Sequence, residues 1–106
     1  MIDLNDENFE KEVLNRKGLF LVDFWSHTCA PCQRMNLVLN NVAKELAGKV
    51  EFGKLNILEE LKIAKRYKIL ATPTIIIFKN EKPIERAVGL RSERVLINKL
   101  NFLIEE

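Results

Sequence analysis

The stretch that decides the fold is FLVDFWSHTCAPCQRM, residues 20–35. It is an apolar run that contains one acid, Asp23, and it is followed by the only two cysteines of the chain, Cys29 and Cys32. A nearly continuous apolar run is typical of a strand that is buried on both faces of a sheet. The stretch therefore predicts a central strand over 19–25, with a carboxylate buried inside it and two thiols just beyond its end.

Length and composition are those of an ordinary globular protein, with 106 residues, 47% of them hydrophobic and 30% charged, and a net charge of +2. A chain of this length buries roughly 65% of the surface that its unfolded form exposes, so we expect one domain over 1–106. The charge is too weak to favour nucleic acid or a membrane surface as a partner. The first residues do not resemble a signal peptide, and no apolar stretch approaches the roughly 18 residues that span a bilayer. We therefore expect a cytoplasmic protein.

The remaining elements are predicted from apolar spacing, cap residues and turn residues. Helices are expected between Asn5 and Gly18, from the cysteines to Gly48, over 59–68, and after Ser92. Strands are expected over 50–56, 74–79 and 84–88, with the last two forming a hairpin. This order requires a mixed sheet with helices on both faces. Active sites of such sheets lie at the carboxyl ends of the strands, which is where Cys29 falls.

The spacing of the two cysteines predicts thiol–disulfide chemistry. Pro31 fits the first turn of a helix, where its missing N–H costs nothing. Cys29 then lies at or near the N-cap and Cys32 about one turn later, at a separation that a disulfide bridges. Unpaired backbone N–H groups and the positive end of the helix dipole favour a thiolate at Cys29. A second thiol within reach resolves a mixed disulfide inside the same molecule.

Two other interpretations of the pair stay open. A structural disulfide that closes so short a loop contributes only about 2 kcal/mol in the chain-entropy model, and such disulfides are rare in a reducing compartment. A metal site is the second alternative. His27, Cys29 and Cys32 supply at most three ligands, so we expect no metal site within one chain, and a tetrahedral site requires a metal-bridged dimer.

Several separated stretches together resemble the thioredoxin family over essentially the whole chain. They are residues 21–25 (LVDFW), 29–32 (CAPC), 54–56 (KLN), 71–74 (ATPT) and 88–89 (VG). Each stretch alone is weak, but their order and spacing together are specific. The resemblance implies the α/β thioredoxin fold, a five-stranded mixed sheet flanked by four helices.

The resemblance also implies roles for four residues. Cys29 is the exposed nucleophile and Cys32 the buried resolving thiol, and the two form the redox-active disulfide. Asp23 is a buried acid that accepts a proton from Cys32, and Lys54 lies near that acid. Burial of a carboxylate disfavours its charged form, so we expect the pKa of Asp23 to be raised toward neutrality, where it exchanges protons at working pH. The alternatives for Asp23 are an acid at the edge of the sheet and an ion pair with Lys54.

A surface for client proteins is implied as well. Pro73 is a cis-proline beside the disulfide, and Thr72 offers its backbone to an extended substrate segment in a short β-type pairing. The rest of this surface consists of Trp25, Thr28, Ala30, Pro31, Gly89 and Leu90. Thr28 and Ala30 replace the tryptophan and glycine that are usual in the family, which affects the choice of partner more than the chemistry. A basic cluster, Lys62, Lys65, Arg66 and Lys68, is expected to be a solvated helix face, with partner docking as the alternative.

The predicted function is a thiol–disulfide oxidoreductase that mainly reduces protein disulfides. The resemblance implies disulfide-containing client proteins and an NADPH-dependent flavoprotein reductase as partners, and no cofactor held by the chain itself. We expect a monomer. The alternatives are a thioredoxin-like oxidase or isomerase, and a non-catalytic docking subunit that binds its partner without using the thiols.

Overall fold

A computed structural model describes the whole chain, residues 1–106. Its centre is one five-stranded mixed sheet with the strand order β1-β3-β2-β4-β5. The strands are β1 (Ile2–Asp3), β2 (Leu19–Trp25), β3 (Val50–Asn56), β4 (Thr74–Lys79) and β5 (Lys82–Val88). Strands β1, β2 and β3 are parallel, whereas β4 runs antiparallel to β2 and forms a hairpin with β5. The predicted mixed sheet and its closing hairpin are confirmed.

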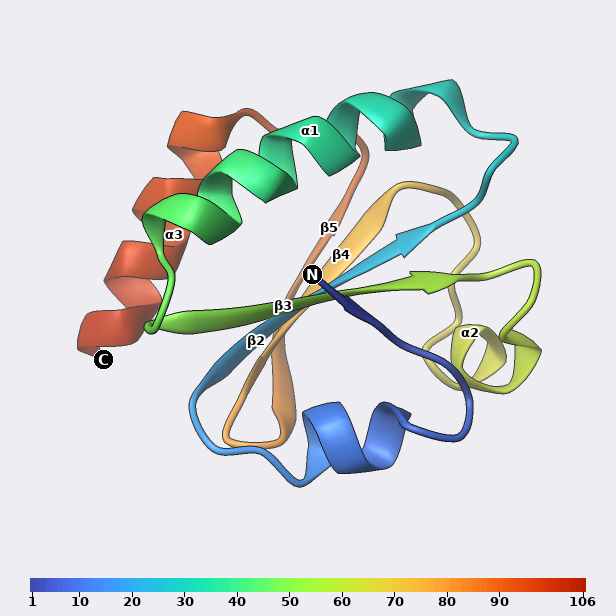
Figure 1. Ribbon diagram of the computed structural model, residues 1–106, viewed down its shortest axis with the longest axis horizontal. Coiled ribbons are helices and arrows are strands. Elements are labelled where there is room, and N and C mark those ends of the chain that lie inside the picture. Colours follow the sequence, from blue (N-terminus) through green and yellow to red (C-terminus); the bar gives the residue numbers. More distant parts are fainter.

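Four helices flank this sheet, as the resemblance implied. They are η1 (Glu10–Leu14), α1 (Ala30–Glu45), α2 (Leu61–Arg66) and α3 (Glu93–Glu105). Helices α1 and α3 lie on one side of the sheet, and η1 and α2 lie on the other (Figure 1). Ser92 caps α3 by accepting a hydrogen bond from the N–H of Val95, as predicted. None of the four helices combines the length and the apolar character that a membrane crossing requires.

The first helix is shorter than predicted. Asn5 does cap this segment, because its side-chain oxygen accepts hydrogen bonds from the N–H groups of Glu7 and Asn8. Regular helical structure nevertheless covers only Glu10–Leu14, in the wider π form. The Arg16 side chain explains the early end, since its Nε donates to the carbonyl of Glu12 that the next helical turn would use.

The helix predicted over 59–68 covers only Leu61–Arg66. Asn56 holds the preceding residues in a turn, because its side-chain oxygen accepts from the N–H of Leu58. The free N–H groups of the first helical turn are satisfied from far away in the sequence, by the Asp6 carboxylate, which accepts from Lys62 and Ile63. At the other end, Lys68 adopts a positive φ of 53°, which stops the helix.

Strand β5 begins at Lys82, two residues before the predicted start. The reason is a tight turn, in which Asn80 and Glu81 both have positive φ values, of 48° and 78°. Two such residues form a two-residue hairpin connection whose twist matches that of the flanking strands. The pairing therefore extends to Lys79 opposite Lys82.

Strand β2 is buried on both faces, as its sequence predicts. Leu19 and Leu21 pack in the core under α1 and α3, whereas Phe20, Val22 and Phe24 pack in the second core, under η1 and α2. Successive side chains of a strand point to opposite faces. This alternation assigns Asp23 to the α1 side of the sheet, in line with Leu19 and Leu21.

The packing of α1 against the sheet generates a stability prediction with an internal control. Leu39 is fully buried in the core beneath α1, whereas Leu37, on the same helix, is 66% exposed. Leu39→Ala should lower the free energy of unfolding by about 2–5 kcal/mol, because it removes buried methyl groups and leaves a cavity. Leu37→Ala should change it by less than about 0.5 kcal/mol. Urea unfolding of both oxidised variants measures the difference, and equal losses would contradict the assigned face of α1.

Candidate active site

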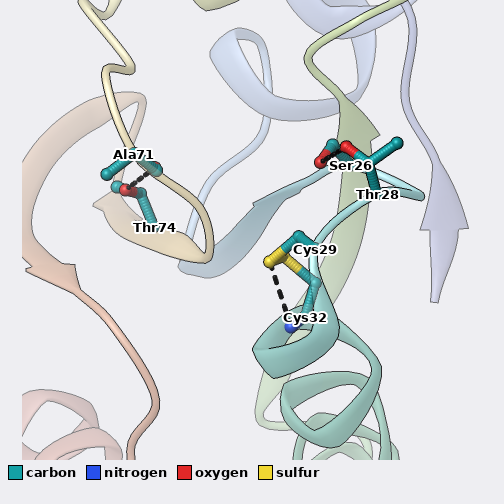
Figure 2. Close-up of a disulfide and its surroundings, with 6 residues drawn as sticks. All are labelled: Ser26, Thr28, Cys29, Cys32, Ala71 and Thr74. Atoms are coloured by element: carbon teal, nitrogen blue, oxygen red, sulfur yellow. Dashed lines mark hydrogen bonds between the residues drawn. A yellow bond between two sulfur atoms is a disulfide. The ribbon is translucent and has the colours of Figure 1, made fainter.

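The two cysteines lie at the N-terminus of α1, just beyond the carboxyl end of β2 (Figures 1 and 2). Cys29 is the N-cap residue, Pro31 lies in the first turn, and the sulfur of Cys29 accepts a hydrogen bond of 3.2 Å from the N–H of Cys32. The Cα atoms of Cys29 and Cys32 are 5.3 Å apart and their sulfurs form a disulfide. The predicted cap position and spacing are confirmed.

The two sulfur-bearing residues differ in their exposure. Cys32 is only 3% exposed because it faces the core beneath α1, whereas Cys29 is partly exposed. Ala30 and Pro31, which separate them, are exposed at the surface. A second protein can therefore reach Cys29 far more easily than Cys32.

Asp23 lies beneath this turn and is only 1% exposed. Its Oδ1 has no hydrogen-bond partner in the protein. Burial raises the pKa of Asp23 from 3.8 to about 7, and the positive charge of Lys54 partly opposes this rise. The carboxyl group is thus buried with the raised pKa that the sequence predicted, close to neutrality.

Lys54 is the neighbour of Asp23 in the register between β2 and β3. The two side chains nevertheless form no ion pair. The Nζ atom of Lys54 lies 4.0 Å from Oδ1 of Asp3 and 5.5 Å from the centre of the Trp25 ring. The ion pair considered as an alternative for Asp23 is therefore absent, and Lys54 acts on Asp23 through its charge at longer range.

Asp23 and Cys32 border the same cavity, which has a volume of about 230 Å³. Trp25 and Lys54 also line it, and so do four residues outside the predicted site, namely Ser26, His27, Gln33 and Asn36. Asn36 carries a signal in the sequence, because residues four apart on a helix share a face and Asn36 is four residues after Cys32. The buried acid and the inner thiol therefore border one common space.

The loop before β4 lies opposite the disulfide (Figure 2). The Thr72–Pro73 peptide bond is cis, as the resemblance implied, and Pro73 is buried. The hydroxyl of Thr74 donates to the carbonyl of Ala71 at 2.7 Å, and the N–H of Gly89 donates to the carbonyl of Pro73 at 2.8 Å. Neither backbone group of Thr72 is hydrogen-bonded within the chain, so both are free to pair with another extended segment.

The remaining residues of the predicted surface lie around this centre. Trp25 ends β2 and is half-buried, and Thr28 is exposed, with its hydroxyl 3.3 Å from that of Ser26 (Figure 2). Gly89, whose φ of 94° suits a residue without a side chain, leads to Leu90, which is 39% exposed. The fold thus brings distant parts of the sequence together at one end of the sheet, beyond the carboxyl end of β2.

The buried acid generates a prediction about stability and pH. The ordinary pKa of Asp23 is 3.8 and its pKa in the folded protein is about 7, so between these values the folded state binds more protons than the unfolded state. The contribution of Asp23 to the free energy of unfolding should therefore fall as pH rises from about 4 to 7, by up to about 4 kcal/mol. Asp23→Asn removes this titration, so its stability relative to the parent protein should rise over that range and level off above it.

Urea unfolding of the oxidised proteins at pH 4, 6 and 8 measures this effect. Glu45→Gln is the matched control, because it makes the same change from carboxylate to amide at an exposed position. It should alter stability by less than about 0.5 kcal/mol at each pH. A constant difference between Asp23→Asn and the parent protein at all three values would contradict the raised pKa.

Comparison with known proteins agrees with this geometry. A family model described as Thioredoxin matches residues 1–102. The thioredoxin of Buchnera aphidicola subsp. Acyrthosiphon pisum is 43% identical over 93 residues, which cover 88% of this chain and 86% of the relative. Those of Rickettsia felis (37% over 99 residues; 93% and 94% covered) and Chlamydia pneumoniae (39% over 98 residues; 92% and 93% covered) are similar at comparable levels. The chain belongs to the thioredoxin family of protein-disulfide reductases, with Cys29 and Cys32 as its redox pair.

Proposed function

We propose that Cys29 is the nucleophile that attacks disulfides of client proteins and that Cys32 is the resolving thiol. One observation carries this assignment, namely the unequal exposure of two sulfurs within a single helical turn. Cys29 is partly exposed at the N-cap, whereas Cys32 is only 3% exposed. An exposed thiolate attacks a foreign disulfide, and a sheltered thiol is suited to attack only its neighbour.

The reaction proceeds in two exchanges. The Cys29 thiolate first attacks one sulfur of the client disulfide, so that a bond forms between Cys29 and the client and the other client sulfur leaves as a thiolate. Cys32 then loses its proton and attacks the sulfur of Cys29. This step forms the Cys29–Cys32 disulfide and releases the second client thiolate. Two electrons pass from the pair to the client, whose two sulfurs take up protons.

Asp23 accepts the proton that Cys32 loses in the second exchange. The proposal is supported by the cavity that both residues border and by the raised pKa of about 7, at which a carboxyl group gains and loses protons readily near neutral pH. The charge of Lys54 lowers the pKa of Asp23 and thereby keeps it within that working range. Lys54 is therefore a positioning and tuning residue in this scheme, not a proton donor.

Client segments dock beside the disulfide. The unpaired backbone groups of Thr72 support a short β-type pairing with an extended client chain, alongside the buried Pro73. The surface around this segment consists of Trp25, Thr28, Ala30, Pro31, Gly89 and Leu90. The small side chains of Thr28 and Ala30 leave the approach to Cys29 open.

The partners and the cellular setting are part of the proposal. Each turnover leaves the pair oxidised, so an NADPH-dependent flavoprotein reductase is proposed to regenerate the dithiol between cycles. We also propose a cytoplasmic location, because a reducing compartment keeps such a dithiol reduced. The single domain over 1–106 and the monomeric state stay predictions.

Two serine variants test the assignment of the two thiols. In an insulin-reduction assay driven by dithiothreitol, Cys29→Ser should be inactive, because the attacking sulfur is gone. Reduced Cys32→Ser, freed of dithiothreitol before it is mixed with insulin, should form a mixed disulfide that persists, since the resolving thiol is missing. Mass spectrometry of the non-reduced mixture detects this adduct. An adduct formed by Cys29→Ser, or the absence of an adduct with Cys32→Ser, would overturn the assignment.

A further inference from the structure

A shallow apolar groove lies on the surface of α2, next to the loop over residues 71–73. We call this segment the client-binding loop, because client segments are proposed to dock there. It has a volume of about 520 Å³, and it is lined mainly by apolar side chains, of which Leu61 and Leu70 are the most exposed, together with Lys65 and Lys68. We call it the α2 groove and define it by these four residues. Leu70 is 94% exposed and Leu61 64% exposed, so the groove presents apolar surface that no part of this chain covers.

The charge around the α2 groove is positive. Lys65 and Lys68 are the only charged residues that line it. Arg86 of β5 adds another cation nearby, because its guanidinium group donates to the carbonyls of Tyr67 and Lys68. A partner that fills this groove with apolar side chains is therefore favoured when it also carries carboxylates.

The acids at the start of α2 do not cancel this charge within the groove. Glu59 and Glu60 line a separate cavity together with Lys54, and the Glu60 carboxylate accepts a hydrogen bond from the N–H of Asp6. The groove thus remains a surface with apolar walls and a basic rim.

The α2 groove is continuous with the client-binding loop. Leu70 directly precedes Ala71 and lies two residues from Thr72, whose backbone groups are unpaired. Figure 2 shows the loop between Ala71 and Thr74 facing the disulfide. An extended chain advances about 3.3 Å per residue, so a client that pairs with Thr72 reaches Leu70 within a few residues of its cysteine.

We propose that the α2 groove selects client segments in which an apolar and an acidic side chain lie within a few residues of the target cysteine. The inference rests on the proposed reduction of client disulfides and adds the class of segment that is preferred. Lys65 and Lys68 attract the client carboxylates, and Leu61 and Leu70 contact the apolar side chain. These residues take no part in the exchange itself.

Single-turnover reduction of model peptides tests this selection. Three disulfide-linked peptides share one leucine near the cysteine and carry either two Glu, two Gln or two Lys beside it. The reduced protein should react with the Glu peptide about three- to tenfold faster than with the Lys peptide at low ionic strength, and high salt should shrink the ratio. Lys65→Glu combined with Lys68→Glu should reverse this order.

The chain offers a matched control for net charge. Lys44→Glu combined with Lys49→Glu makes the same change in charge at exposed positions, one in the last turn of α1 and one just before β3. This variant should keep the order of the parent protein. Leu70→Ser should slow reduction of the leucine peptides about three- to tenfold while a peptide with serine in place of the leucine reacts unchanged. Leu70 is almost fully exposed, so this variant should fold normally, and far-UV circular dichroism checks it.

The outcomes separate this inference from the proposed function. Equal rates for the three peptides with activity intact would overturn the inference alone, and so would the same shift in the Lys44/Lys49 control. A dimer that Leu70→Ser dissociates would assign the groove to a second copy of the chain and overturn it too. If Leu70→Ser changed the recycling of the protein by a reductase but left its reduction of the peptides unchanged, that result would also overturn the inference. Failure of the parent protein to reduce any peptide would overturn both proposals.

Discussion

The hydrogen bond from the backbone N–H of Cys32 to the sulfur of Cys29 ties the chemistry of this protein to its fold. It makes Cys29 the cap of α1, so the helix begins where β2 has just ended. The disulfide therefore lies at the carboxyl end of this central strand. The same turn points Cys32 into the core. Two identical side chains three residues apart thereby acquire different surroundings. The outer sulfur receives one backbone donor and faces the positive end of the helix dipole, whereas the inner thiol borders the same cavity as a buried acid.

The buried acid carries a cost in stability that its chemistry explains. Asp23 is held in the strand with the most complete burial, with one carboxylate oxygen unpaired and a pKa of about 7. A leucine at this position would fit the pattern of Leu19 and Leu21 on the same face. Buried ionisable groups with perturbed pKa values are concentrated at functional sites, where activity is maintained at the expense of stability. The nearby Lys54 does not relieve the cost by pairing, because it forms no ion pair with Asp23 and its amine lies 4.0 Å from Oδ1 of Asp3.

Patterns in the sequence predicted the strands and helices whose formation depends on residues close to one another in the chain. The apolar run over 19–25 indicated a strand buried on both faces. Because successive side chains of this strand point to opposite faces of the sheet, Asp23 lies under α1. The start of α2 was mispredicted because its cap, Asp6, lies more than fifty residues away. The cavity beneath the disulfide was also missed in part, because Ser26 and Gln33 meet there only once β2 and α1 are packed. The cis bond at Pro73 came from the family resemblance, since most X-Pro bonds in folded proteins are trans.

The difference between the two thiols is open to direct measurement. The reduced protein is treated with a small excess of iodoacetamide across a range of pH, and mass spectrometry follows the modification of each cysteine. The account predicts that Cys29 reacts first and is already reactive near neutral pH, that Cys32 is protected by at least about tenfold, and that unfolding in urea equalises the two rates. Equal rates in the folded protein, or faster modification of Cys32, would contradict the claim that one turn of α1 divides the pair into an attacking and a resolving thiol.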